Sequence, residues 1–215
     1  MDTKLIEIYQ IYYNEETKYH CLPELFIPYD NSGVNDGEYE FSVMKKLYES
    51  DWSNREYLGV ISWKFDWKIQ NMIPESVSNN IRNIRISPRY FTQSIDQNYG
   101  KYDIYHINPW PKWDEYNTWH QGEMFHSKML YYLKVLQQIK GIGKGWDESV
   151  YNKKCLNYCN YWVANKKTWD LYMEVAMEVY PVVKGTEIFP YVMERVISSV
   201  LHDNQDDLKI YRCKI

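Results

Sequence analysis

Polar and aromatic side chains lie at the ends of three apolar segments that have the pattern of buried strands. They are Gln10, Tyr12 and Tyr13 at the end of the first segment, Ser62, Trp63 and Lys64 at the end of the second, and His106 and Asn108 at the end of the third. In an open α/β sheet, ligands bind at the carboxyl edge of the strands. An amide such as Gln10 can pair with a nucleobase, a tyrosine can stack on it, and Lys64 can act as a point charge on a diphosphate. The alternative for Lys64 is an ordinary solvated strand end.

Two carboxylates are candidates for acid–base chemistry. Glu123 lies three residues before His126 in the segment W-H-Q-G-E-M-F-H, so the two side chains are neighbours on a helix. That pair suits proton transfer or metal ligation, although solvent-facing helices also carry Glu and His without a function. Asp147 follows the glycine-rich segment 141–145. This segment comes after a helical pattern, whereas a phosphate-binding loop must open a helix, so it is interpreted as a hinge or a lid.

The order of strand and helix patterns predicts how these residues are positioned. Strands are expected at 4–13, 57–65, 102–107, 160–164 and 208–213, and the segment 26–32 is expected to be a loop. Helices are expected around 41–48, after Pro74, from 119 to 139, after Asn165 until Pro181, and after Thr186. The alternation indicates an α/β fold: one domain over residues 1–215, with a mostly parallel mixed sheet flanked by helices on both faces.

Composition excludes several classes of function. The 215 residues carry a net charge of −4, which disfavours a nucleic-acid groove. No apolar run is long enough to cross a membrane and no signal peptide is evident, so a soluble, cytoplasmic protein is expected. Four cysteines without zinc spacing are interpreted as reduced thiols. Aromatic residues make up 17% of the chain, which suits sugar faces and nucleobases but is also compatible with core filling.

Five sequence blocks together resemble a known family. They are E-I-Y-Q-I-Y-Y (7–13), F-I-P-Y-D-N-S (26–32), I-S-W-K-F (61–65), I-N-P-W-P (107–111) and C-N-Y-W-V-A-N-K-K-T-W-D (159–170). The chain resembles GT-A-type glycosyltransferase domains of bacteria and large DNA viruses, among them domains that build glycans on viral capsid proteins. The resemblance implies a single nucleotide-binding α/β sheet, a UDP-sugar as donor, and often Mn²⁺ or Mg²⁺.

The resemblance assigns site residues unevenly. Gln10, Tyr12 and Tyr13 match the strand that holds uridine, Asp30 and Asn31 match the loop beside it, and Ser62 and Lys64 match a further block. The family's Asp-x-Asp metal motif is replaced by Asn108 and Trp110. A divalent cation therefore lacks its usual ligands, and His106 and Asn108 are the only candidates on that strand.

The sequence thus predicts a UDP-sugar-dependent glycosyltransferase that extends a growing glycan, for example on a viral capsid glycoprotein in the host cytoplasm. If the reaction inverts the anomeric centre, Glu123 is the first candidate base and Asp147 the second. If it retains the configuration, no protein base is required. The alternatives are a non-catalytic carbohydrate-binding module and a nucleotide-sugar hydrolase.

Overall fold

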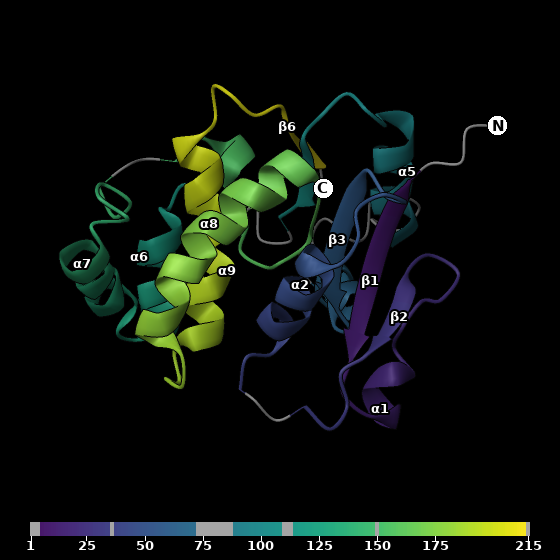
Figure 1. Cartoon of the computed structure of the whole chain (residues 1–215), viewed down its shortest axis with the longest axis horizontal. Helices are drawn as coiled ribbons and strands as arrows, with labels where there is room; N and C mark the ends of the chain where they lie inside the picture. Colours follow the sequence, from purple (N-terminus) through teal and green to yellow (C-terminus); the bar gives the residue numbers. More distant parts are fainter. Residues whose placement is uncertain (1–4, 35–36, 72–87, 109–113, 149–150, 214–215) are drawn as a thin grey trace.

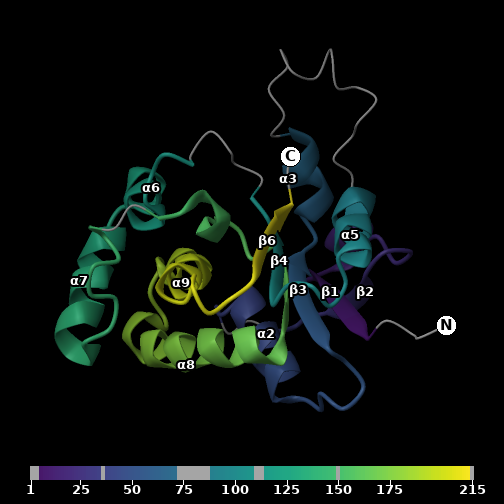
Figure 2. The same cartoon turned by 90° about the horizontal axis from the view of Figure 1, so that it is seen from above.

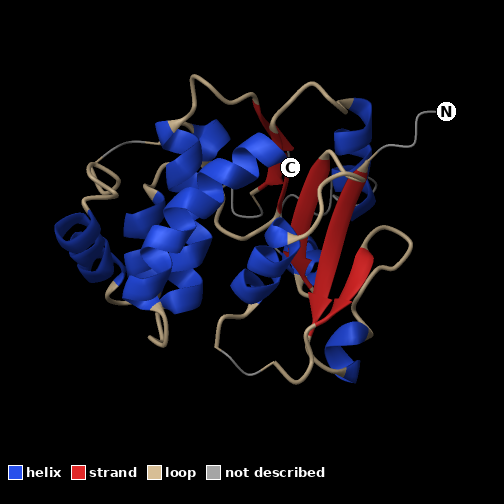
Figure 3. Cartoon of the chain, in the orientation of Figure 1, coloured by secondary structure: helices blue, strands red, loops and turns tan. Residues whose placement is uncertain are grey.

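One mixed sheet organises the protein. The computed structural model describes residues 5–34, 37–71, 88–108, 114–148 and 151–213. Its strands are β1 (Ile6–Tyr12), β2 (Ile27–Asp30), β3 (Tyr57–Ser62), β4 (Ile104–Ile107), β5 (Trp162–Asn165) and β6 (Ile210–Cys213). They lie in the order β2-β1-β3-β5-β4-β6. β1 pairs in parallel with β2 and β3, β4 pairs in parallel with β6, and β5 runs antiparallel to both of its neighbours (Figure 3).

Helices cover both faces of this sheet, which confirms the predicted α/β class. They are α1 (Glu15–Lys18), α2 (Glu40–Glu49), α3 (Phe65–Asn71), α5 (Pro88–Gln97), α6 (Thr118–Phe125), α7 (Met129–Lys140), α8 (Lys166–Val183) and α9 (Phe189–Asp203), with a short 3-10 turn η2 (Lys153–Cys155). Seen from above, α3 and α5 lie on one face, α2, α8 and α9 on the other, and α6 and α7 beyond α9 (Figures 1 and 2).

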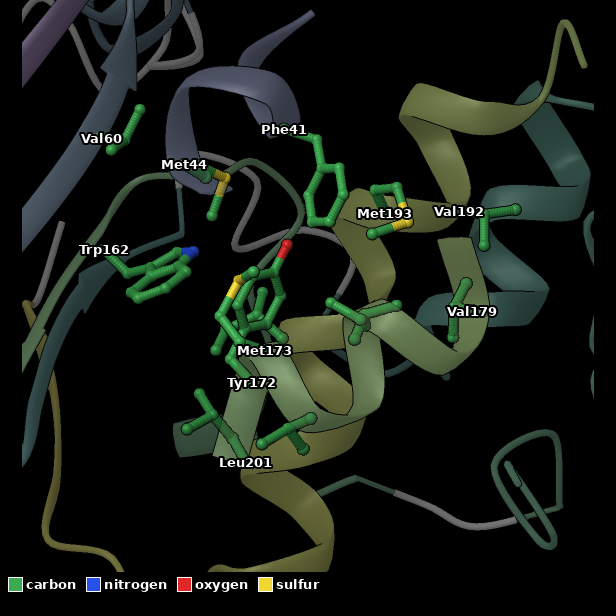
Figure 4. Packing of buried hydrophobic residues seen from close by; sticks show 14 of the residues in the cluster. Phe41, Met44, Val60, Trp162, Tyr172, Met173, Val179, Val192, Met193 and Leu201 are labelled. Atoms are coloured by element: carbon green, nitrogen blue, oxygen red, sulfur yellow. The ribbon is translucent and has the colours of Figure 1, made fainter. Parts of the chain in front are cut away.

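Alternation along the strands supplies two apolar cores. In β3, Leu58 and Val60 face the larger core with α2, α8 and α9, whereas Ile61 faces the smaller core with α3 and α5. Because successive strand side chains point to opposite faces, a strand covered on both faces is apolar throughout. Figure 4 shows Met44, Trp162 and Tyr172 meeting in the larger core. Packing on both faces holds the sheet in place, and the carboxyl ends of the parallel strands β1 and β3 lie at one edge of it.

The helix after β5 begins where the sequence predicts. Asn165 is the N-cap of α8, and its side-chain oxygen accepts a hydrogen bond from the backbone N–H of Thr168 at 3.1 Å. The predicted apolar stripe, Trp169, Tyr172, Met173 and Ala176, is buried. Both features confirm the reading of this segment as cap and amphipathic helix.

The segment 26–32, predicted as a loop, contains strand β2. Its residue Pro28 lies opposite Gln10 of β1. Proline has no N–H and is excluded from central strands, but β2 is the edge strand and pairs on one side only. The loop prediction was wrong for Ile27–Asp30, where an edge strand tolerates the proline.

The helix predicted from 119 to 139 is two helices. α6 ends at Phe125, α7 begins at Met129, and Lys128 between them has a left-handed backbone with φ 81°. The apolar period continues across the break, and so the pattern gave no sign of it.

Two other helix boundaries differ from the prediction. Pro181 lies inside α8, in the last turn before Val183, instead of ending the helix before it. A proline there removes one backbone hydrogen bond near a helix end. The last helix begins at Phe189 and not directly after Thr186, with Pro190 in its first turn. Helices α3 and α5 were not predicted, and the helix expected after Pro74 lies outside the described residues.

Among the described residues, none of the helices combines the length and the apolar character required to span a bilayer.

Candidate functional site

A cavity of about 400 Å³ opens at the carboxyl edge of β1 and β3. The strand side contributes Tyr13, Ser62, Trp63 and Lys64. The helix side contributes residues from the starts of α2 and α9 and from the turn before α9; they are Tyr39, Glu40, Glu187, Pro190, Tyr191 and Glu194, and Lys68 of α3 completes the lining. Three of the predicted nucleotide-sugar-binding residues, Tyr13, Ser62 and Lys64, therefore meet in one pocket.

Lysines form one wall of the pocket. Lys64 follows β3 directly, and its Nζ lies 5.1 Å from the centre of the Trp63 ring. Lys68 is one helical turn further on, and its backbone N–H donates to the carbonyl of Lys64 at 2.8 Å. The two ammonium groups therefore project from neighbouring positions, a spacing that suits an anionic group with more than one oxygen.

The ammonium group of Lys68 is set among polarisable partners. Its Nζ lies 3.5 Å from Sγ of Cys159 and 5.4 Å from the centre of the Tyr161 ring. The Cys159 sulfur, followed by Tyr161, Glu194 and Glu40, raises the pKa of Lys68 despite its partial burial. Lys68 therefore remains protonated. Tyr161 in turn shares a hydrogen bond of 3.2 Å with the hydroxyl of Ser62, which fixes the floor of the pocket.

Carboxylates also line the pocket. Glu40 is in the first turn of α2 and half-buried, and no other described residue forms an ion pair or side-chain hydrogen bond with it. Burial raises the pKa of Glu40, and the negative charge of Glu194 raises it further, against the opposing effect of Lys68 and Lys64. Glu194 itself is paired with the buried guanidinium of Arg195 at 2.9 Å.

Gln10 and Asn31 are buried and do not line the pocket. Gln10 is fully buried and its Oε1 accepts from the backbone N–H of Leu22 at 2.7 Å. Its Nε2 has no partner among the described residues, and the same holds for Oδ1 of Asn31, which is 2% exposed. Buried polar atoms without partners are rare in folded proteins, so each requires an explanation such as a ligand or water.

Tyr12 and Asp30 lie on the strand ends but do not line the pocket. Tyr12 is buried, with Nζ of Lys18 at 5.7 Å from its ring centre. Asp30 is exposed and accepts from the backbone N–H of Ser32 at 2.8 Å. The Ser32 hydrogen bonds lower the pKa of Asp30, which keeps it ionised.

The two predicted catalytic carboxylates lie away from this pocket. Glu123 lines a separate, shallower hollow with Tyr116 and His120. Its carboxylate accepts from the backbone N–H groups of Lys128 at 3.2 Å and Leu130 at 2.9 Å, so it caps the start of α7. Asp147 accepts from the side chain of Gln137 at 3.2 Å. The structure does not bring either of them together with Lys64.

His106 and Asn108, the candidate metal ligands, are fully buried and engaged in the fold. His106 donates from Nε2 to the carbonyl of Lys154 at 2.7 Å, and Asn108 donates from Nδ2 to Asp114 at 3.0 Å. Nδ1 of His106 has no partner among the described residues, and neither His106 nor Asn108 lines the pocket at β1 and β3. Within the described ranges, no group of three or more His, Cys, Asp or Glu side chains is placed to hold a metal ion.

Sequence reasoning missed Glu40, Lys68 and Glu194. Lys68 was detectable, since it follows Lys64 at the four-residue spacing of a helix. Glu40 immediately precedes the apolar stripe that begins at Phe41, but its approach to the strand ends depends on tertiary packing. Glu194 lies on a helix that was interpreted by its apolar face alone.

Comparisons with protein-family models, curated proteins and solved structures gave no match to this chain.

Proposed function

We propose that the protein is a glycosyltransferase that moves a sugar from a UDP-sugar to a hydroxyl of a growing glycan. The observation that carries the proposal is the pocket at the carboxyl edge of β1 and β3, where Tyr13, Ser62 and Lys64 meet. In open α/β sheets this edge is where nucleotides bind. The choice of uridine over other bases rests on the sequence resemblance.

The charge distribution of the pocket supports a diphosphate donor. Lys64 and Lys68 offer two ammonium groups on one wall, and charge on the leaving diphosphate is stabilised most effectively by preorganised cations. Because neither His106 nor Asn108 lines this pocket, we assign this charge stabilisation to the lysines and derive no step through a metal. Tyr13, Tyr39, Trp63 and Tyr191 add aromatic surface that suits the faces of a sugar or a base.

Lys64→Ala tests the donor site. Loss of a charge-assisted contact costs about 1.5–3 kcal/mol, so the dissociation constant of UDP should rise about tenfold or more. Isothermal titration calorimetry measures it, with Lys46→Ala, an exposed lysine on α2, as the matched control. Equal UDP affinity in the two variants would remove Lys64 from the site.

Product analysis separates the proposal from its alternatives. The protein is incubated with a panel of UDP-sugars, chosen by thermal shift because a bound ligand raises the unfolding temperature. Release of UDP that depends on an added acceptor glycan supports a transferase. Equal release without acceptor indicates a hydrolase, and binding without release indicates a carbohydrate-binding module.

A further inference from the structure

Glu40 and Glu194 lie in the same pocket but differ in what holds them. Glu194 is paired with Arg195, which is 3% exposed and donates its second nitrogen to Oε1 of Gln121 at 2.8 Å. This buried guanidinium is the ion-pair partner of Glu194. Glu40 has no comparable cationic partner in contact with it among the described residues. Of the two, Glu40 is therefore the carboxylate that we consider as a proton acceptor.

The backbone before Glu40 is strained. Tyr39 has φ 49°, in the left-handed region that side chains other than glycine rarely adopt. The preceding residue, Glu38, is held in place by ion pairing with Lys184 at 2.9 Å and by a hydrogen bond from Tyr180. Strain of this kind persists only where the surroundings enforce it, and it concentrates at functional sites. Here it sets the direction in which α2 starts and hence the position of Glu40.

We propose that Glu40 is the catalytic base that removes the proton from the acceptor hydroxyl; this inference rests on the transferase activity proposed above. The acceptor O–H bond breaks and its proton passes to the Glu40 carboxylate, while the acceptor oxygen forms a bond to the anomeric carbon. The bond from that carbon to the diphosphate oxygen breaks, and the diphosphate keeps the electron pair beside Lys64 and Lys68. Glu40 afterwards returns its proton to water.

The charges of the lining residues determine the direction of the transfer in this proposal. An anionic diphosphate is attracted to Lys64 and Lys68 and repelled by Glu194, so we place the acceptor beside Glu40, on the other side of the sugar. Attack from the side opposite the leaving group inverts the anomeric centre. The transfer should therefore give a product with the opposite anomeric configuration to that of the donor.

The pocket favours a base that titrates closer to neutrality than an ordinary glutamate. The groups that face Glu40 are Glu194 on α9, Lys68 on α3 and Lys64 after β3, and Glu187 lines the same pocket. Burial and Glu194 raise the pKa of Glu40, against the lysines. A base whose pKa lies nearer the working pH is a more effective proton acceptor. The rate should accordingly rise with pH as Glu40 ionises and then level off.

Glu40→Gln tests the assignment against Glu49→Gln, an exposed glutamate at the other end of α2. Removal of a general base lowers rates by roughly 10²–10⁴-fold. We expect a loss of kcat in that range for Glu40→Gln, with the dissociation constant of UDP unchanged and the rise of rate with pH abolished. Glu49→Gln should match the wild type. Thermal unfolding of each variant checks that it is folded.

Glu40→Asp keeps a carboxylate on a shorter side chain and should transfer faster than Glu40→Gln. Equal rates in these two variants, a Glu40→Gln variant as active as Glu49→Gln, or a product of retained configuration would each overturn the assignment. Failure of the underlying function is seen separately, in the wild type, as absence of both UDP-sugar binding and acceptor-dependent release of UDP; in that case the assignment falls with it.

Discussion

His106 shows how burial determines the charge of a single side chain in this protein. It is fully buried on β4, and its Nε2–H donates to the carbonyl of Lys154. Burial lowers the pKa of His106 to about 4; the hydrogen bond opposes this effect and the nearby charge of Arg212 adds to it. The ring is therefore neutral at pH 7 and acts as a structural hydrogen-bond donor.

His106→Gln should flatten the pH dependence of stability. In the unfolded chain a histidine titrates near 6.5, so the unfolded state takes up a proton first as the pH falls. The stability that depends on a neutral His106 is complete above that value and is lost as the pH falls through about 4. The loss amounts to about 3 kcal/mol, and glutamine, which can still donate to Lys154, avoids it. Urea unfolding of the wild type and of His106→Gln at pH 7, 5 and 4 measures this loss. Equal losses of unfolding free energy in the two proteins would contradict the prediction.

Residues at strand ends were predictable and residues from helix starts were not. Tyr13, Ser62 and Lys64 meet because parallel strands end at a common edge, which follows from the strand pattern alone. Glu40 and Glu194 reach the same pocket from α2 and α9, and their approach depends on how those helices pack on the sheet. Gln10 was expected to contact a base, whereas its oxygen is bound to the backbone of Leu22.

At the scale of elements, the junction between α6 and α7 depends on one carboxylate. Glu123 accepts from two backbone N–H groups at the start of α7, donors that a helix cannot satisfy itself. Lys128, between the helices, has the left-handed φ of 81°. These two residues explain why a continuous apolar period contains a break.

Substitutions at the junction should have opposite effects on stability. Glu123→Ala removes the cap and should lower the free energy of unfolding by about 1 kcal/mol. Lys128→Gly relieves the left-handed backbone and should raise it by about 0.5–1 kcal/mol, because its exposed ion pair with Glu187 contributes little. Urea denaturation measures both. Effects of the same sign would show that the junction is not strained in this way.

For the whole molecule, the contact between β3 and β5 holds the two halves of the sheet together. Gly59 of β3 lies opposite Val163 of the antiparallel β5. A Cβ at Gly59 would lie 2.6 Å from Cγ2 of Val163 and 3.0 Å from the carbonyl oxygen of Trp162. The strands approach so closely there that only glycine fits.

Gly59→Ala should destabilise the fold by about 1–3 kcal/mol through overpacking. In a Val163→Ala background the nearest methyl group is absent, so the same substitution should cost less. Thermal or urea unfolding of the wild type, the two single variants and the double variant gives the coupling energy between the two positions. An equal cost in both backgrounds would indicate that the Val163 methyl group is not the obstacle.

The α/β class follows from the alternation of strand and helix patterns, but the direction of β5 does not. An apolar strand pattern reads the same in either direction, so the expected mostly parallel mixed sheet did not specify that the antiparallel strand is the one between β3 and β4. Helix boundaries at Pro181 and Lys128 depended on local backbone geometry, which periodicity does not report.

The strand order also determines when the edge of β3 is covered during synthesis. β1, β2 and β3 leave the ribosome early, but β3 keeps an open edge until β5 has followed α7. An uncovered apolar edge strand is a template for pairing with other chains, and chains begin to fold from the N-terminal side. Glu194 and Arg195 emerge later still, on α9. A nascent chain therefore has an exposed β3 edge until β5 is made, and its pocket lacks Glu194 until α9 is made.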